Sequence, residues 1–428
     1  MSPLPGIVGA LLVLGGCMVG LRLLQRRYHP HPELVRKLMH LCVGATALSF
    51  PLLFHDPQPV WWICGVAIAF MLALKYVSPL RALLGGVLDS VDRFSLGDVY
   101  FLAGVAVLFT VSGGGLTFTI PMLVLTFADA LAALIGVGYG RLRYPAADGV
   151  KSLEGSVAFL TVAFVSAHVP LLLSGATGRA ESLVIALLIG ILVMLLEAIS
   201  WQGLDNLFIP LGTFVVLNGH LDRPLELLLF HLAAAVTLTA LVLLLRRRLG
   251  LEGSALLGAA FVAYLCLTLG GWPWLFAPAA LLAGYALLAH RSRLPGDIHA
   301  LVALTSPGLF WLLLAVYGRR PELYYPFTLS FAAQLACAAA LALPADPDGR
   351  VRPGPLAARV GLAWALVFVP YAVLLGAGGL VPALHGLCVT AVAALLCLAL
   401  RRARRLSFEL QTTLAATASL FGLAPLGA

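Results

Sequence analysis

Long apolar runs separated by short basic segments are the feature that most constrains this chain. The first run extends from Leu4 to Leu24, and its charged residues follow it, so we expect a retained helix and not a cleaved signal peptide. About 20 apolar residues are what a helix needs to cross a bilayer. Charged residues make up only 11% of the sequence, against about a quarter in soluble domains. The sequence therefore predicts an all-α fold, a polytopic integral membrane helical bundle.

The basic residues gather between the apolar runs, which predicts both the number of crossings and their orientation. Counting the runs gives about 16 transmembrane segments. Basic loops stay on the cytoplasmic side, so the net charge of +8 needs no nucleic-acid partner. To keep the Arg141 and Arg246 clusters inside, the short segment from Asn206 to Asn218 must cross as well, which places both termini outside. Arg319-Arg320 is then the one basic pair that this scheme places outside. The clusters expected in the cytoplasm are Arg22 to Arg27 with Arg36-Lys37, Lys75 to Arg93, Arg141 to Lys151, Arg246 to Arg248, Arg291 to Arg293, Arg350 to Arg352 and Arg401 to Arg405.

Ionisable residues divide the chain into two regions. Up to residue 248 they interrupt apolar segments, as Asp129 and Glu197 do, whereas from residue 249 onward they are confined to loops. A charge inside a membrane segment is costly and marks a functional site by default. The sequence predicts a catalytic membrane domain over residues 1–248 and an accessory polytopic membrane domain of unknown role over residues 249–428. The seven cysteines show no CxxC spacing, so neither a disulfide framework nor a zinc site is indicated.

The segment after His29-Pro30-His31-Pro32 places basic side chains at the start of an apolar run. Arg36 and His40 are one helical turn apart and share a face, with Lys37 beside them. This face could bind a phosphate near the cytoplasmic surface. The alternative is that Arg36 and Lys37 only anchor the helix end in the interface, while His40 donates a hydrogen bond to another helix.

Asp129 opens a stripe of small residues that continues through Gly136 to Gly140. The stripe alone indicates close helix packing, but packing does not explain a carboxylate on it. The acid would lie about 16 Å of helix away from Gly140, and therefore in a cavity below the membrane surface. We expect Asp129 to be a catalytic residue and a metal ligand.

The basic loop that follows, from Arg141 to Val150, leads into Lys151-Ser152-Leu153-Glu154-Gly155. Ser152 is suited to cap the next helix, which would leave backbone N–H groups and a positive helix end beside Lys151 and Arg141. Such an arrangement binds anions. Either part alone would favour an ordinary capped cytoplasmic loop. Together with Asp129, the block predicts a phosphate site formed by Gly136, Gly140, Arg141, Lys151, Ser152, Glu154 and Gly155.

A second acidic block closes the polar part of the chain. Glu197 ends an apolar run, and Asp205-Asn206 opens the next short one. Oxygen ligands suit Mg²⁺, which binds through one or two carboxylates and substrate phosphates. We expect Asp129 and Asp205 to hold the metal, Asn206 to contact the nucleotide, and Glu197 and Asp205 to be catalytic, as base or as ligand. The alternative is that Asp205-Asn206 merely caps a helix.

Taken in order, these blocks resemble the CTP-dependent polyprenol kinases, a family that includes dolichol, phytol and farnesol kinases. The resemblance spans roughly Glu33 to Leu217. It implies transfer of the γ-phosphoryl group of CTP to the terminal hydroxyl of an isoprenoid alcohol, with Mg²⁺, at the cytoplasmic face. The partners implied are CTP, a membrane-dissolved alcohol and the bilayer. The matching blocks are Arg36-Lys37-x-x-His40, Gly97-Asp98-Val99-Tyr100-Phe101, Asp129-Ala-x-Ala with Gly136 and Gly140, Lys151-Ser152-x-Glu154-Gly155-Ser156, and Glu197 to Asn206 with Pro210.

Two other functions fit parts of the pattern. CDP-lipid synthases, which are cytidylyltransferases, have a comparable layout of acid, glycines and Lys-Ser/Thr-x-Glu-Gly, but also a longer acidic block that Gly203 to Pro210 does not reproduce. A transporter or scaffold could use Asp129 and Glu197 in an ion pathway, although such a pathway does not need the Lys151 loop.

Overall fold

The computed structural model describes residues 3–76, 96–146, 149–249, 251–289, 294–344, 346, 351–402 and 408–421. Contacts divide the chain into two compact units, Met1–Ala233 and Ala234–Ala428, and the division falls inside one long helix. Some predicted basic clusters lie wholly or partly outside the described residues, namely Lys75 to Arg93, Arg291 to Arg293, Arg350 to Arg352 and Arg401 to Arg405.

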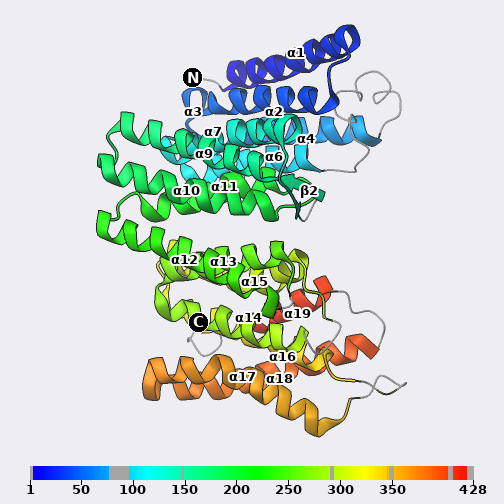
Figure 1. Cartoon of the computed structure of the whole chain (residues 1–428), viewed down its shortest axis with the longest axis vertical. Coiled ribbons are helices and arrows are strands. Elements are labelled where there is room, and N and C mark those ends of the chain that lie inside the picture. The colour runs from blue at the N-terminus through cyan, green and yellow to red at the C-terminus, as the bar shows by residue number, and fades with distance from the viewer. Residues whose placement is uncertain are drawn as a thin grey trace. The chain divides into compact units, whose positions relative to one another are not determined.

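Unit 1 is a bundle of helices that run back and forth along one direction (Figure 1). Its most buried helix is α10, which has buried residues along its whole length from Ser182 to Ile199. The elements are α1 (Leu4–Tyr28), α2 (Pro32–Leu48), α3 (Phe50–Leu53), α4 (Pro57–Tyr76), α6 (Gly97–Ser112), α7 (Leu116–Leu123), the π-helical η2 (Val124–Ala128), α8 (Asp129–Tyr139), β1 (Arg143–Ala146), β2 (Gly149–Ser152), α9 (Leu153–Ser174), α10 (Arg179–Ile199), α11 (Asp205–His220) and α12 (Leu225–Leu249).

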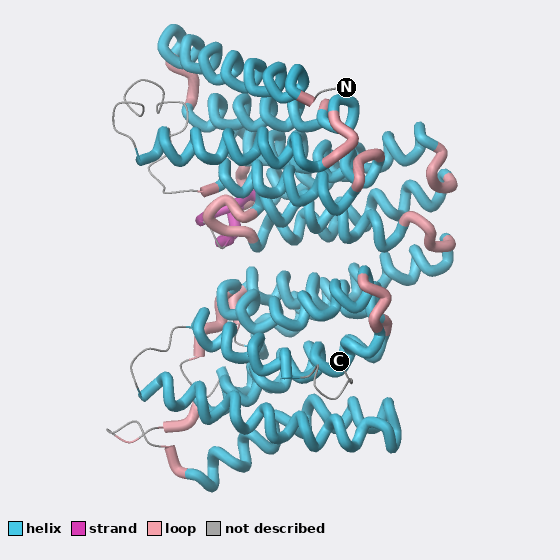
Figure 2. The backbone as a smooth tube through the Cα atoms, turned by 180° about the vertical axis from the view of Figure 1, so that it is seen from behind, coloured by secondary structure: helices cyan, strands magenta, loops and turns pink. Residues whose placement is uncertain are grey.

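A small β-hairpin interrupts the helical pattern where the sequence predicts only a loop. Strands β1 and β2 pair antiparallel, with Arg143 opposite Ser152 and Tyr144 opposite Lys151. Gly149 opens β2 with φ of +109°, a conformation that favours glycine. The hairpin, magenta in Figure 2, lies at the end of unit 1 where α1 is followed by α2. This pairing fixes the direction of the Lys151 side chain, which a flexible loop could not do.

Unit 2 packs around α16, which is buried at every position from Tyr325 to Ala340. Its one ion pair among the described residues joins the exposed side chains of Arg320 and Glu322. The elements are α13 (Gly253–Leu265), the π-helical η3 (Cys266–Gly270), η4 (Trp272–Leu275), α14 (Phe276–Ala289), α15 (Ile298–Tyr317), η5 (Pro321–Leu323), α16 (Tyr324–Leu341), α17 (Pro353–Leu375), η6 (Gly376–Gly379), α18 (Leu380–Arg402) and α19 (Phe408–Leu420).

The all-α membrane fold is confirmed in outline, but a count of about 16 crossings is not. Eight segments of the described chain are long and apolar enough to cross a membrane, and the last of them, Pro353–Arg401, contains both α17 and α18. Other apolar runs form helices that are shorter than a crossing, such as Gly97–Ser112. Helix α11, which holds the segment from Asn206 to Asn218, has 16 residues and is not among the eight. Hydropathy counts apolar runs, whereas crossing also requires helix length.

Candidate functional site

A buried ion pair joins α2 to α8. Lys37 donates from Nζ to Oδ2 of Asp129 at 2.7 Å, and the two side chains are only 3% and 8% exposed. One turn further along α2, the Nε2 atom of His40 lies 3.4 Å from the same carboxylate oxygen and donates to the Leu125 carbonyl at 2.9 Å. That carbonyl belongs to η2, the π-helical turn directly before Asp129. The carboxylate is therefore held by a cation and an imidazole away from water.

A second ion pair joins the hairpin to the end of α10. Lys151 donates from Nζ to Oε1 of Glu197 at 2.7 Å and also to the Glu197 backbone carbonyl. Burial by itself lowers the pKa of Lys151, but the charge of Glu197 outweighs it and raises this pKa above its ordinary value. Lys151 is therefore a permanently charged ammonium group at neutral pH.

Asp205, the first residue of α11, connects the two pairs electrostatically. It is close enough to Asp129, Lys37 and Lys151 to interact with the charge of each. Glu197 likewise interacts with both aspartates. These three carboxylates and two ammonium groups carry a net charge of −1, counted as −3 and +2. One cluster therefore combines groups that bind a metal with groups that bind phosphate.

The glycines of the Asp129 stripe bring α8 against the start of α9. A side chain at Gly140 would meet Ser152 Oγ at 2.7 Å, and one at Gly155 would meet the Ala132 carbonyl at 3.0 Å. Ser152 accepts a hydrogen bond from the Gly155 N–H at 3.1 Å, so it caps α9 as the sequence predicts. The small residues thus set the distance between Asp129 on α8 and Lys151 at the hairpin.

Asn206 adds an oxygen next to Asp205. Its Nδ2 donates to the Gly97 carbonyl at 3.1 Å, whereas its Oδ1 is buried and has no hydrogen-bond partner in the described part of the chain. Buried polar atoms normally have partners, so this oxygen is suited to a ligand. No group of three or more His, Cys, Asp or Glu side chains forms a metal cage among the described residues. The oxygens of Asp129, Asp205 and Asn206 are of the chemical type that Mg²⁺ binds, together with water and phosphate.

Three predicted residues lie at the margin of this cluster. Arg36 pairs with Glu33, at 2.6 Å between Nη2 and Oε1, although it still interacts with the charges of Asp129 and Asp205. Glu154 accepts from the Leu142 N–H at 3.1 Å and so supports the hairpin. Arg141 is exposed. Their roles in nucleotide binding remain predictions.

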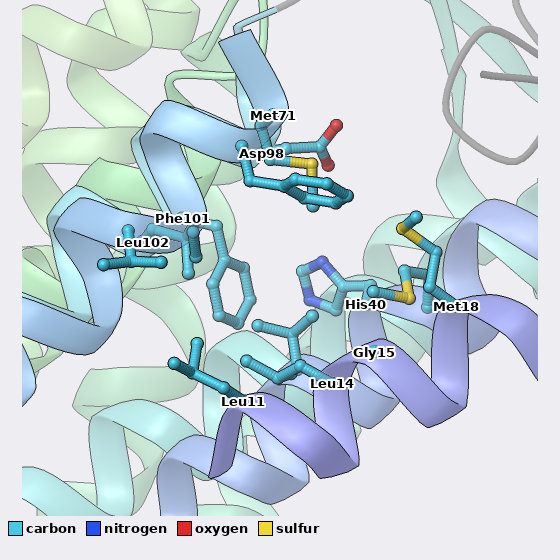
Figure 3. A pocket seen from close by; sticks show the side chains of 14 residues that line it. Leu11, Leu14, Gly15, Met18, His40, Met71, Asp98, Phe101 and Leu102 are labelled. Carbon is cyan, nitrogen blue, oxygen red and sulfur yellow. The ribbon is translucent and has the colours of Figure 1, made fainter. Parts of the chain in front are cut away.

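An apolar cavity adjoins the cluster at His40 (Figure 3). It measures about 310 Å³, and residues of α1, α2, α4 and α6 line it. Among its fourteen lining residues, His40 and Asp98 are the ones with polar side chains. The His40 ring therefore faces the cavity and also lies next to Asp129.

Several features of the site escaped the sequence analysis. The π-helical turn at Leu125 and the hydrogen bond between Tyr144 and Ser156 at 2.6 Å have no recognisable local signal. The pair of Glu33 and Arg36 has the ordinary i, i+3 spacing of a helix and was overlooked. Asp98 belongs to a block of the family resemblance, Gly97-Asp98, although no binding or catalytic role was assigned to it from the sequence.

Comparison with known proteins identifies the family. No protein-family model and no solved structure matches the chain. The chain is 30% identical over 223 residues to the phytol kinase of Synechocystis sp., in an alignment that covers 48% of this chain and 88% of that protein. Identity at this level over nearly the whole relative reflects common descent, and the chain belongs to the polyprenol and phytol kinase family.

Proposed function

We propose that this protein is a CTP-dependent kinase that phosphorylates the terminal hydroxyl of an isoprenoid alcohol at the cytoplasmic face of the membrane. The observation that carries the proposal is that Asp205 interacts electrostatically with both ion pairs, the buried Lys37–Asp129 and the half-buried Lys151–Glu197. The relative of known activity is a phytol kinase, and phytol is an isoprenoid alcohol.

The cluster suits phosphoryl transfer because that reaction depends mainly on positioning and charge neutralisation. Lys37 and Lys151 already face carboxylates, and each can turn its ammonium group to a phosphate oxygen when a nucleotide enters. Asp129, Asp205 and the Asn206 amide oxygen would then hold Mg²⁺. Bound there, the metal ion would neutralise charge on the triphosphate.

The transfer needs no reactant other than CTP and the alcohol. The alcohol oxygen forms a bond to the γ-phosphorus, the bond from that phosphorus to the β–γ bridging oxygen breaks, and CDP leaves. The hydroxyl proton passes to a carboxylate. Asp205 has no ion-pair partner among the described residues, so it is available as base or as metal ligand, while Glu197 is the other candidate for the base.

The cytoplasmic orientation rests on charge. Arg26 and Arg27 belong to the last turn of α1, and Arg143 and Lys151 belong to the hairpin. The end of α1 and the hairpin lie at the same end of unit 1 (Figures 1 and 2). Basic residues are retained on the cytoplasmic side, which is also where CTP is available.

The direct test is to incubate the purified protein with Mg²⁺ and CTP labelled in the γ-phosphate, together with phytol, farnesol or a longer polyprenol. The expected products are CDP and a labelled lipid monophosphate, and ATP, GTP and UTP serve as alternative donors. Release of pyrophosphate with phosphatidate as acceptor would instead identify a CDP-lipid synthase. The kinase proposal fails if no alcohol in the panel becomes labelled with any donor.

A further inference from the structure

We propose that the cavity between α1, α2, α4 and α6 is the binding site for the isoprenoid chain, with the hydroxyl end at His40. This inference rests on the proposed function, because it assigns the acceptor of that reaction to a place in the fold. It concerns a different part of unit 1 from the two ion pairs, and His40 is the residue that the cavity and the charged cluster share.

The walls of the cavity are chemically suited to an isoprenoid chain. The cavity is lined by leucine, valine, phenylalanine and methionine side chains, with polar groups only at His40 and Asp98. A ligand in such a site must be apolar over most of its length and polar at one point. Met18, Met39 and Met71 contribute flexible thioether side chains from three different helices, and methionine adapts to irregular, flexible ligands.

The cavity is accessible to a lipid from the bilayer. On the α4 wall, Val66 is 49% exposed and Phe70 is 39% exposed. Helix α1 packs loosely, with Ala10, Met18 and Leu21 as its buried residues, and it is a candidate membrane span. A lipid dissolved in the membrane can therefore enter between apolar surfaces without passing through water. A nucleotide, which carries several negative charges, could not use this route.

His40 lies between the cavity and the charged cluster. Its ring lines the cavity while its Nε2 lies 3.4 Å from the carboxylate of Asp129. Because Nε2 donates its hydrogen to the Leu125 carbonyl, Nδ1 of the neutral ring is the atom that can accept a hydrogen bond from the alcohol as it binds, before the hydroxyl turns to the carboxylate that takes its proton. A hydroxyl group at this point is beside the cluster in which we place the triphosphate. The sequence suggested a phosphate-binding role for His40, and the cavity assigns it to the acceptor instead.

Two glycines of α1 provide a matched pair of variants. A Cβ added at Gly15 or at Gly16 would meet no atom of the described residues within 4 Å, so both positions are open to a side chain. Gly15 lines the cavity and Gly16 does not. We therefore expect Gly15→Phe to occupy cavity volume and Gly16→Phe to leave it unchanged.

Photolabelling in phospholipid vesicles tests the site without requiring turnover. Phytol with a diazirine near its hydroxyl should label Met39, His40 or Phe101, and phytol with a diazirine at its far end should label α1 or α4. Gly15→Phe should reduce labelling by about tenfold or more, whereas Gly16→Phe should label as the wild type does. Excess unlabelled phytol should compete, and an alkane of equal length should compete much less.

The outcomes separate this inference from the proposed kinase activity. Labelling of the cavity by a protein that transfers no phosphate would refute the kinase and keep the lipid site. Transfer of phosphate with the label on other helices, or equal labelling of the two glycine variants, would refute the lipid site and keep the kinase. Competition by the alkane as strong as by phytol would refute the assignment of the hydroxyl to His40.

Discussion

Removing one partner of the Lys37–Asp129 pair should strongly destabilise the protein. The two charged atoms are 2.7 Å apart and both side chains are almost fully buried. Lys37→Met leaves the Asp129 carboxylate without its cation, and Asp129→Asn leaves the ammonium group without its anion. Loss of one member of a buried pair costs about 3–5 kcal/mol. For a cooperative unit of the size of unit 1, this corresponds to a fall in melting temperature of about 6–20 °C.

Removing both charges should behave differently. The double variant Lys37→Met with Asp129→Leu has no isolated charge, so most of the lost stability should return. Phosphoryl transfer should remain absent in both single variants and in the double variant, because the proposed site needs both groups. This combination, stability restored without activity, distinguishes a functional charge pair from one that only holds the helices together.

The measurement is thermal unfolding in detergent, followed by intrinsic fluorescence, combined with a double-mutant cycle. Glu322→Gln is the control, since its exposed pair with Arg320 at 3.8 Å should change stability by less than about 1 kcal/mol. A Lys37→Met protein that melts like the wild type would show that the pair is absent in solution. A double variant with normal turnover would refute its place in the site.

Three further predictions use other parts of the site. Gly140→Leu places a side chain against Ser152 and should lower the free energy of unfolding by about 1–3 kcal/mol and abolish turnover. Gly138→Leu is the control, because a new Cβ there meets no atom of the described residues within 4 Å, and it should change neither. Equal melting curves and equal rates for the two variants would contradict the packing of α8 against α9. Glu197 raises the pKa of Lys151 above 10.5, so the stability that the charged lysine contributes should be constant from neutral pH to about pH 10 and be lost only as the pH rises through the raised pKa. A melting temperature that falls between neutral pH and about pH 10 in the wild type, but not in a Lys151→Met Glu197→Gln double variant, would refute this prediction. Val150 of the hairpin is exposed, and a cysteine in its place should react with a membrane-impermeant thiol reagent in inside-out vesicles but not in intact cells. The wild type gives the background labelling, and reaction in intact cells would reverse the proposed orientation.

Residue type and local spacing were enough to find the polar groups of the site. Asp129 and Glu197 stand out because a carboxylate in an apolar helix is costly, and the Ser152 cap follows from the residues around it. The packing of α8 against α9 is likewise visible as small residues at helical spacing. These properties belong to short segments, so a sequence displays them directly.

The partners of those groups could not be predicted because they come from distant parts of the chain. Lys37 and Asp129 are 92 positions apart, and no local pattern indicates that they meet. Arg36 differs, because its partner Glu33 is only three positions away on the same helix, and its phosphate-binding role stays a prediction. The cavity was invisible for a related reason, since the residues of α1 and α4 that line it are the same apolar types that face lipid.

Substitution of Asp205 by asparagine tests the central claim most directly. Asp205 is repelled by Asp129 and has no ion-pair partner among the described residues, and an asparagine oxygen can still accept the Asn206 N–H. The measured quantities are the melting temperature and the transfer of label from γ-labelled CTP to phytol. The account predicts an unchanged or higher melting temperature with transfer reduced by about a hundredfold or more. Transfer within a few-fold of the wild-type rate, or loss of activity together with a lower melting temperature, would contradict it.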